Sequence, residues 1–488
     1  MDGNLDAGFL ARIGAPPTRI AIIGGGASGV IAAANLARAS CGDAEIVLIE
    51  RRRDVGRGLA YSTRQPDHLL NVRASNMSAF ADDPDHFFRW LLVRGSEFGV
   101  DAPTPSCFAP RMVYGEYVRD LLNEPSAQSV RRVADECVGL EETGRGVRVR
   151  LGSRGPIDVD LAILATGHDV RCASVGGVKA LDAWDGAGLA AVGSDDPVLV
   201  VGTGLTMVDV VLSLHRRGHR GPITAVSRRG LAPTTHAPCA PRPLPRDAVP
   251  LGAPVSALAR WLRENTRFAQ AEGGDWRGAV DALRPHTRAL WQAMTLEQRR
   301  RFLRHARPWW DVHRHRMAPA VSEVIGKLQS KGQLRVLAGR IESATRSDGA
   351  IEVAVRRRGA ATVDTLSVGH VIAATGSPDG PHRSRDPLIR ALLCDGAARP
   401  DPLGISLDVT DTGAVIDADG RASERLFAIG PPSRAAFWEM IAIPDIRDQC
   451  AELARRLAGS AGVSPIRAKF GVLLNLSAGP PASSRQPA

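Results

Sequence analysis

Two stretches of the chain combine closely spaced glycines with flanking apolar runs. Residues 20–33 read IAIIGGGASGVIAA, and residues 198–211 read VLVVGTGLTMVDVV. In each stretch a strand-like run is followed by glycines and then by a helical pattern. Glycines at such a turn let backbone N–H groups at the start of a helix come close to a phosphate. The spacing therefore predicts two binding sites for dinucleotides.

The first stretch has the complete G-x-G-x-x-G pattern. The run IAII predicts a strand buried on both faces, and the next strand, EIVLIE, ends at an acid. A carboxylate at this position accepts hydrogen bonds from both hydroxyls of an adenosine ribose. One unit of about thirty residues thus contains a strand, the glycines, a helix, a second strand and a terminal acid. This combination is a specific signal of a dinucleotide-binding unit. The expected cofactor contacts are Gly24, Gly26, Ser28, Gly29, Glu50 and Arg51.

The second stretch lacks its third glycine. Gly202 and Gly204 take the places of the first two, but Met207 stands in the third. We therefore expect this helix to lie further from its strand or to turn differently. The next strand reads ITAVS, and a count of 26 residues from the first glycine reaches Glu50 in one unit and Arg228 in the other. The side chain at this position is thus predicted to be negative in the first unit and positive in the second.

The reversed charge predicts a different nucleotide in the second unit. An arginine there suits a ribose that carries a 2′-phosphate, as in NADPH. The expected contacts are Gly202, Gly204, Thr206, Ser227, Arg228 and Arg229. The alternative is a solvated pair of arginines in a chain whose basic residues are almost all arginine. One tightly held FAD and one visiting NADPH would explain two sites with different preferences.

Two short apolar strands, in 161–169 and 369–380, each end in Ala-Thr-Gly. Such strands close a dinucleotide fold, and we expect cofactor contacts at Thr166, Gly167, Thr375 and Gly376. The sequence predicts an α/β protein with two Rossmann-like domains in a glutathione-reductase-like arrangement, the NADPH domain inserted in the FAD domain. The expected parts are a disordered N-terminus (1–17), the FAD domain (18–189 and 336–460), the NADPH domain with a helical insertion (190–335) and a tail (461–488).

Composition argues against several other function classes. The net charge is +10, but arginines and acids are interleaved and aromatic residues make up only 5%, unlike a nucleic-acid surface. The seven cysteines are scattered, without the spacing of a zinc site or a redox-active dithiol. The start of the chain lacks a signal-peptide pattern, and no uncharged apolar run approaches about 18 residues. We therefore expect a cytoplasmic protein without metal, membrane or nucleic-acid partners.

Several longer motifs resemble one family. The chain, over roughly 18–458, resembles bacterial FAD/NAD(P)-binding proteins of the NAD-binding-9 type, which are related to flavin-dependent N-hydroxylases and flavin-containing monooxygenases. Besides the glycine motifs and SRRGL, the resemblance is carried by GRGLAYSTRQPDHLLNVRASNMSAF (56–80), FAPRMVYGEYV (108–118), WWDVHRHRMAP (309–319) and FWEMIAIPDIRDQ (437–449).

The resemblance implies that segment 56–80 wraps the flavin. Asn71, Arg73 and Asn76 would then lie near the isoalloxazine or the nicotinamide as catalytic residues; the alternative is that they order the loop. Gly430 is the expected contact near the C-terminus, but Pro431 follows it where the family usually has an acid. The Baeyer–Villiger marker F-x-G-x-x-x-H-x-x-x-W is absent, so that activity is not expected.

The run WWDVHRHRMAP allows two interpretations. His313 and His315, with Arg314 and Arg316, could bind a substrate carboxylate or the NADPH phosphates. The interpretation that we favour is an amphipathic helix with Trp309, Trp310 and Val312 in the core and solvated charges. Trp438, Glu439 and Ile443 are expected near the flavin, or Glu439 pairs with Arg447.

The resemblance implies a monooxygenase that uses NADPH and O₂ through a C4a-hydroperoxyflavin. The substrate would be a small polar molecule, either an amine or amino acid or a heteroaromatic such as a purine. A flavin reductase or oxidase without oxygen insertion and a non-enzymatic flavoprotein are the alternatives. The sequence is also compatible with a homo-oligomer.

Overall fold

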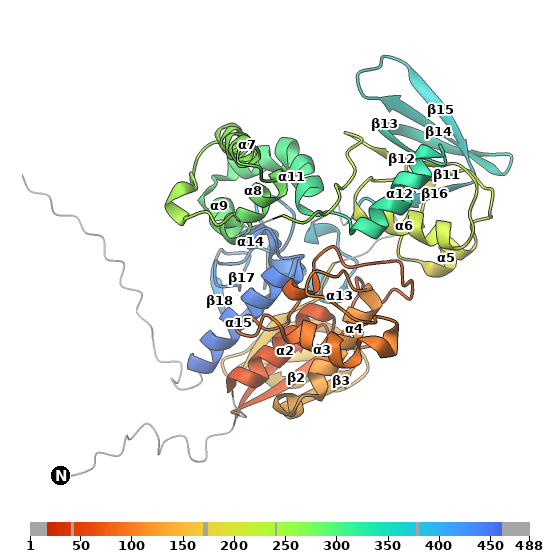
Figure 1. The fold of residues 1–488 in the computed structure, drawn as a ribbon. Helices are drawn as coiled ribbons and strands as arrows, with labels where there is room; N and C mark the ends of the chain where they lie inside the picture. The colour runs from red at the N-terminus through yellow and green to blue at the C-terminus, as the bar shows by residue number, and fades with distance from the viewer. Residues whose placement is uncertain (1–16, 41–42, 169–173, 240–241, 377–379, 461–488) are drawn as a thin grey trace, which may run out of the picture.

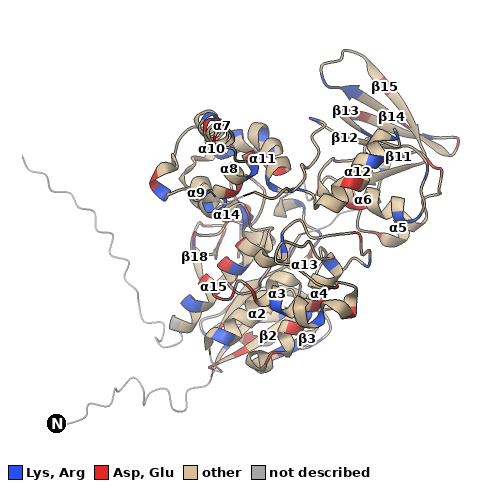
Figure 2. Cartoon of the chain, in the orientation of Figure 1, with Lys and Arg blue, Asp and Glu red and all other residues tan. Residues whose placement is uncertain are grey.

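The computed structural model describes residues 17–40, 43–168, 174–239, 242–376 and 380–460. Figure 1 shows three parts: an α/β unit at the bottom, a second α/β unit at the upper right and a group of helices at the upper left. Basic and acidic residues are interspersed over all three (Figure 2). None of the described helices combines the length and hydrophobicity that a membrane span requires. The termini predicted to be disordered lie outside the described residues, apart from Pro17.

The first unit is built on a six-stranded sheet in the order β17-β18-β7-β1-β2-β3, parallel except for β17. Its strands are β1 (Thr18–Ile23), β2 (Ala44–Glu50), β3 (Val130–Ala134), β7 (Leu161–Leu164), β17 (Ala414–Ile416) and β18 (Ala422–Ala428). Its helices include α2 (Ala27–Ser40), α3 (His86–Arg94), α4 (Arg111–Asp120), α13 (Pro387–Cys394), α14 (Arg434–Phe437) and α15 (Ile443–Ser460).

The strand pattern explains why this sheet is buried on both faces. In β1, Ile20 and Ile22 pack in one core cluster, beneath α2 and α15, while Ala21 and Ile23 pack in another. The period of two along a strand sends alternate side chains to opposite faces, so a continuous apolar run suits a central parallel strand. The C-terminal helix α15 packs against α2 (Figure 1), and thus brings the end of the chain beside the first glycine motif.

The second unit has a seven-stranded sheet in the order β10-β16-β11-β12-β13-β14-β15. Its strands are β10 (Leu181–Asp182), β11 (Val198–Val201), β12 (Ile223–Ser227), β13 (Leu334–Ser347), β14 (Ala350–Arg357), β15 (Val363–Val368) and β16 (His370–Ala373). Its helices are α5 (Gly186–Ala190), α6 (Leu205–Arg216) and α12 (Pro319–Ser330). The two sheets confirm the predicted α/β fold, with one Rossmann-like unit inserted in the other.

The second sheet takes strands from both sides of the boundaries at 190 and 335, which stay predictions. β10, at residues 181–182, and β13 to β16, at 334–373, all belong to the second sheet. β13 pairs with β12 in parallel and continues into an antiparallel pair with β14. The sequence shows this hairpin but not the sheet that it joins, because register across sheets depends on tertiary contacts. A similar antiparallel sheet in the first unit contains β4 (Cys137–Glu142), β5 (Val147–Leu151) and β6 (Ile157–Val159).

The helices at the upper left of Figure 1 span 255–314 and are called the helical cap below. They are α7 (Val255–Ala271), α8 (Trp276–Ala282), α9 (Thr287–Ala293), α10 (Leu296–Arg301) and α11 (Arg307–Arg314). Trp291 of α9 stacks on Trp438 with ring centroids 4.8 Å apart, and its indole N–H donates to the Ala435 carbonyl. This aromatic contact attaches the cap to the C-terminal part of the first unit.

Candidate functional site

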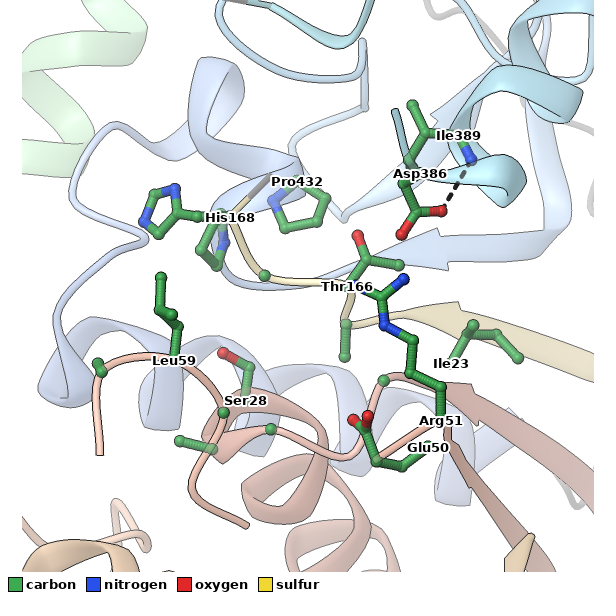
Figure 3. A pocket seen from close by; sticks show the side chains of 18 of the residues that line it. Ile23, Ser28, Glu50, Arg51, Leu59, Thr166, His168, Asp386, Ile389 and Pro432 are labelled. Carbon is green, nitrogen blue, oxygen red and sulfur yellow. Dashed lines mark hydrogen bonds between the residues drawn. The ribbon is translucent and has the colours of Figure 1, made fainter. Parts of the chain in front are cut away.

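A cavity of about 400 Å³ lies at the carboxyl ends of the first sheet's central strands. Glu50 and Arg51 lie at one end, and His168 and Leu59 at the other, with Ser28 between (Figure 3). Ligands of open α/β sheets bind at this edge, where the strands end. The cavity brings together seven of the predicted FAD contacts: Gly24, Gly26, Ser28, Glu50, Arg51, Thr166 and Gly167.

Close backbone packing explains the first and third glycines of this site. Gly24 has φ +107°, and a Cβ added there would lie 2.5 Å from the Ala165 carbonyl oxygen. A Cβ on Gly29 would lie 1.9 Å from the Gly24 carbonyl oxygen. The absence of both side chains lets α2 begin directly against the strand ends, so its first N–H groups open toward the cavity.

Glu50 is fixed at the end of the cavity by the backbone. Its Oε2 accepts from the Gly25 N–H at 2.7 Å, and its Oε1 accepts from the Arg52 N–H at 2.9 Å. A carboxylate has about four acceptor positions, so two remain for ligand hydroxyls. Arg51 lines the same end, where its hydrogen bond to Glu136, 2.7 Å long, raises the pKa of its guanidinium. This end fits an adenosine ribose.

The cavity is also lined by residues outside the glycine motifs. They include Arg57 to Tyr61, which belong to the segment 56–80 that was expected to wrap the flavin, His168 directly after Ala-Thr-Gly, Trp184, and Ile441, Ile443 and Ile446 from the C-terminal segment. Ile443 was expected near the flavin, and position 168 was signalled by the strand that it follows. Trp184 and Ile446 had no local signal, because they reach the cavity through contacts distant in sequence.

Gly430 lies beside the cavity rather than in its lining. It has φ +65°, and a Cβ there would lie 2.8 Å from the Ser28 hydroxyl oxygen. The glycine therefore lets the chain pass close to the start of α2. Pro431 and Pro432, which replace the usual acid, do line the cavity.

The second unit repeats the first glycine but not the third. Gly202 has φ +117°, and a Cβ there would lie 2.3 Å from the Ala374 carbonyl oxygen, which matches the contact of Gly24 with Ala165. Met207, in the third position, is fully buried in the core of the second unit. This helix therefore packs through a side chain where α2 packs through its backbone.

Strand register corrects the predicted reversal of charge. Ile23 pairs with Ile49 in the first sheet, and Val201 pairs with Val226 in the second. The structural equivalent of Glu50 is therefore Ser227, and Arg228 corresponds to Arg51. The count of 26 residues was wrong by one because the second unit has one residue fewer between its two strands. The acid is thus replaced by a neutral hydroxyl, which two arginines follow.

Ser227 is also held by hydrogen bonds, one from a side chain and one from the backbone. The Thr203 hydroxyl donates to Ser227 Oγ at 2.8 Å, and the Gly230 N–H donates to it at 3.1 Å. Arg228 is exposed, and Arg229 donates to the Arg304 carbonyl of the cap at 3.4 Å. Neither arginine lines either of the two cavities described here.

A second cavity, of about 290 Å³, lies between α6 and segment 62–68 of the first unit. Of the predicted NADPH contacts, Thr206 lines it, whereas Gly202, Gly204, Thr375 and Gly376 do not. Trp184 lines both cavities and therefore lies between them.

The wall between the units is held by buried polar contacts. Arg111 and Asp209 form an ion pair at 2.6 Å, and both side chains are about nine-tenths buried. His68 Nε2 lies 2.9 Å from both the Asp209 carbonyl oxygen and the Ser213 hydroxyl. Burial lowers the pKa of His68, which favours the neutral imidazole.

The geometry matches known proteins at two levels. Residues 21–169 match the sequence model of a family described as FAD-NAD(P)-binding. The similarity to this family covers that part of the chain. No curated protein sequence matches the chain.

Solved structures resemble the whole fold. Ornithine N-hydroxylase from Kutzneria sp. 744 is 16% identical, with a TM-score of 0.62, and the match covers 91% of this chain and 99% of that one. L-lysine 6-monooxygenase from Pseudomonas syringae is 15% identical, with a TM-score of 0.63 and the same coverage. Thioredoxin reductase from T. acidophilum is 10% identical, with a TM-score of 0.50, covering 92% and 99%. At these identities the likeness shows the fold.

The predicted catalytic residues lie outside the lining of both cavities. Within the first unit, Arg73 donates to the Ala237 carbonyl at 2.9 Å, and His236 Nε2 lies 3.0 Å from the Asn71 carbonyl oxygen. Asn76 is exposed. Arg73 and the Asn71 backbone thus hold the segment after β12 against the domain, and a catalytic role for Asn71, Arg73 and Asn76 stays a prediction.

The favoured interpretation of WWDVHRHRMAP was right about the helix and about Val312, which is 8% exposed, but wrong about the other positions. Arg314 and Arg316 are buried, at 7% and 1% exposure, whereas Trp309 is 48% exposed. The arginines turn inward because acids distant in sequence face them: Arg314 faces Glu439, and Arg316 pairs with Asp281. Glu439 also accepts from the Trp310 indole N–H at 2.9 Å.

Among the described residues, no group of three or more His, Cys, Asp or Glu side chains is arranged to hold a metal ion. Cys137 lines the first cavity, where burial raises the pKa of its thiol to about 12. A thiol with such a pKa is a poor nucleophile at neutral pH.

Proposed function

We propose that the chain is an FAD-dependent oxidoreductase that takes a hydride from NADPH and hydroxylates a small polar substrate with O₂. The observation that carries the proposal is the pairing of two equivalent glycine turns with different strand ends, Glu50 in one and Ser227-Arg228-Arg229 in the other. The ornithine and lysine hydroxylases with the same fold support it. A cytoplasmic location is part of the proposal.

FAD fits the first cavity by the chemistry of its lining. The turn at Gly24 and Gly26 would receive the pyrophosphate, and Glu50 would accept the ribose hydroxyls. When bound, FAD supplies the redox chemistry, namely acceptance of a hydride and activation of O₂. Ile441, Ile443 and Ile446 would cover the reacting end and exclude water from it.

NADPH fits the second unit through its charge. The turn at Gly202 would hold the pyrophosphate, and Arg228 and Arg229 would pair with the 2′-phosphate through charge-assisted hydrogen bonds. Ser227 is compatible with that phosphate because it is neutral, whereas a carboxylate in its place would repel the phosphate. A dithiol mechanism is not part of the proposal, since Cys137 has no partner cysteine within C-x-x-C spacing.

The test begins with the purified full chain. We expect a yellow protein whose flavin is reduced faster by NADPH than by NADH in anaerobic stopped-flow measurements. A panel of amines, amino acids and purines is then scored for stimulated NADPH oxidation and for product mass with ¹⁸O₂. A product that is heavier by one ¹⁸O atom supports hydroxylation. Peroxide alone, with every panel member unchanged, would favour the reductase or oxidase, and a protein that binds no flavin would refute the proposal.

A further inference from the structure

Three arginines converge where the helical cap meets the C-terminal segment. Arg284 lies in the turn between α8 and α9, Arg314 ends α11, and Arg447 lies in the first turns of α15. The Arg314 side chain is 7% exposed, that of Arg447 16% and that of Arg284 23%. We call these three residues the arginine cluster.

Two carboxylates face the cluster without hydrogen-bonding to it. Arg314 Nε lies 3.5 Å from Glu439 Oε2, and Arg284 Nη2 lies 3.6 Å from Asp445 Oδ2. Within the part of the chain that the structure describes, six buried polar atoms here have no hydrogen-bond partner: Arg284 Nη2, Arg314 Nε and Nη2, Arg447 Nη1, Glu439 Oε2 and Asp445 Oδ2. Buried polar atoms are nearly always hydrogen-bonded, so such a concentration requires an explanation.

The charges of the cluster are only weakly compensated. Glu439 and Asp445 make no hydrogen bond to Arg284 or Arg314, and Arg447 Nε donates at 3.3 Å to Asp448, whose side chain is 65% exposed. Burial raises the pKa of Asp445 to about 6, so this carboxyl is easily protonated. Burial and the neighbouring Arg314 both lower the pKa of Arg284. A buried cation without a counter-ion is costly, and the cost disappears when an anion binds.

The cluster lies beside the first cavity. Ile443 and Ile446 line that cavity, and Arg447 follows on the same face of α15, four residues after Ile443. Arg447 is also near Tyr114: burial raises the pKa of that phenol, and the charge of Arg447 acts in the opposite direction. Tyr114 packs on Tyr61, a lining residue, with ring centroids 4.8 Å apart.

We propose that Arg284, Arg314 and Arg447 bind a carboxylate or phosphate group of the substrate. The inference rests on the proposed function and narrows its substrate class to small organic anions. Guanidinium groups bind both oxyanions through paired N–H donors, and three of them at one place explain the unpartnered nitrogens. An anion held here lies beside the part of the cavity lined by Ile443 and Ile446, so the rest of the substrate can extend into the cavity.

Isothermal titration calorimetry on the FAD-loaded full chain tests the proposal, with succinate and inorganic phosphate as probes and ionic strength held constant with NaCl. We expect saturable binding of at least one probe. Binding of succinate alone indicates a carboxylate substrate, and binding of phosphate alone a phosphorylated one. Arg284→Gln and Arg447→Gln should each weaken it tenfold or more, whereas Arg301→Gln, which removes half of an exposed pair with Glu297, should leave it unchanged.

Asp445→Asn provides an opposite test that does not depend on a destabilising arginine substitution. It removes a competing carboxylate, so the affinity for the probe should increase several-fold. The proposal is overturned if neither probe binds the wild-type protein, or if none of Arg284→Gln, Arg447→Gln and Asp445→Asn changes the affinity. It is also overturned if Arg284→Gln and Arg447→Gln weaken NADP⁺ binding instead, since the cluster would then serve the cofactor. Flavin reduction by NADPH, measured on the same samples, reports separately on the proposed function.

Discussion

The two glycine turns of this chain share one constraint and differ in two others. In both, the first glycine lies against the carbonyl of the alanine in Ala-Thr-Gly, so that a Cβ would come within 2.5 Å or less of Ala165 or Ala374. In the third position, Gly29 has no room for a Cβ, but Met207 has room for a whole side chain. At the strand end, one unit has Glu50 and the other has Ser227.

The difference separates what the fold requires from what the ligand requires. The first glycine meets its own closing strand, which is internal to each Rossmann unit, so neither unit can dispense with it. The third position only sets how the helix packs, through backbone in α2 and through a side chain in α6. The side chain at the strand end accepts hydrogen bonds from the turn in both units, but its charge differs, and we propose that this charge selects the nucleotide.

The largest effect is expected from Gly29→Ala. The new Cβ would lie 1.9 Å from the Gly24 carbonyl oxygen, so the helix or the turn must move. Overpacking of this kind costs about 1–3 kcal/mol, and the rigid backbone on both sides places this case at the upper end or above. We expect at least a tenfold loss of FAD affinity and a lower unfolding temperature.

The matched control is Gly204→Ala in the second unit. A Cβ there meets no atom within 4 Å, and the residue already has a negative φ of −82°. Differential scanning fluorimetry and flavin content should stay close to wild type. Equal losses in the two variants would show that the loss in Gly29→Ala does not come from the contact with the Gly24 carbonyl.

The sequence allowed the two turns and their fold to be predicted, because glycine spacing and strand patterns are local. It did not reveal the register that makes Ser227 the equivalent of Glu50, since one residue fewer in the second unit changes no local pattern. The burial of Arg314 and Arg316 also escaped prediction. Charged residues on a helix usually face solvent, and only Glu439 and Asp281, more than thirty residues away in sequence, reverse that tendency here.

A second test transfers the strand-end acid of the first unit to the second. Ser227→Glu places a carboxylate where the 2′-phosphate of NADPH would bind. Two like charges side by side in a binding site weaken binding by several kcal/mol. We expect kcat/KM for NADPH to fall by about a hundredfold while that for NADH changes little, measured by anaerobic flavin reduction. Ser227→Gln, which has the same size without the charge, should lose much less. If Ser227→Glu keeps the wild-type ratio of kcat/KM for NADPH to kcat/KM for NADH, the 2′-phosphate does not bind at this strand end.

A smaller effect is expected when the arginines are removed and no acid is added. Charge-assisted hydrogen bonds contribute about 1.5–3 kcal/mol, so the Arg228→Ala, Arg229→Ala double variant should lose about tenfold to a hundredfold in kcat/KM with NADPH. Arg220→Ala is the control, since it removes an exposed arginine of the same unit that pairs with Asp195. If the double variant prefers NADPH over NADH as strongly as this control does, Arg228 and Arg229 are the solvated pair that the sequence also allowed.

The smallest effect belongs to Glu50→Gln in the first unit. The amide oxygen can still accept from the Gly25 N–H, but the amide NH₂ cannot accept from the Arg52 N–H, so one backbone contact is lost along with the charge. The ribose hydroxyls then donate to a neutral acceptor, which weakens their hydrogen bonds by about 1 kcal/mol in total. We expect the FAD dissociation constant, measured by flavin fluorescence, to rise by about tenfold or less, while the ratio of NADPH to NADH stays at its wild-type value. A changed preference between NADPH and NADH in this variant would mean that Glu50 contacts NADPH as well as FAD. This outcome would contradict the proposal that each strand end binds its own nucleotide.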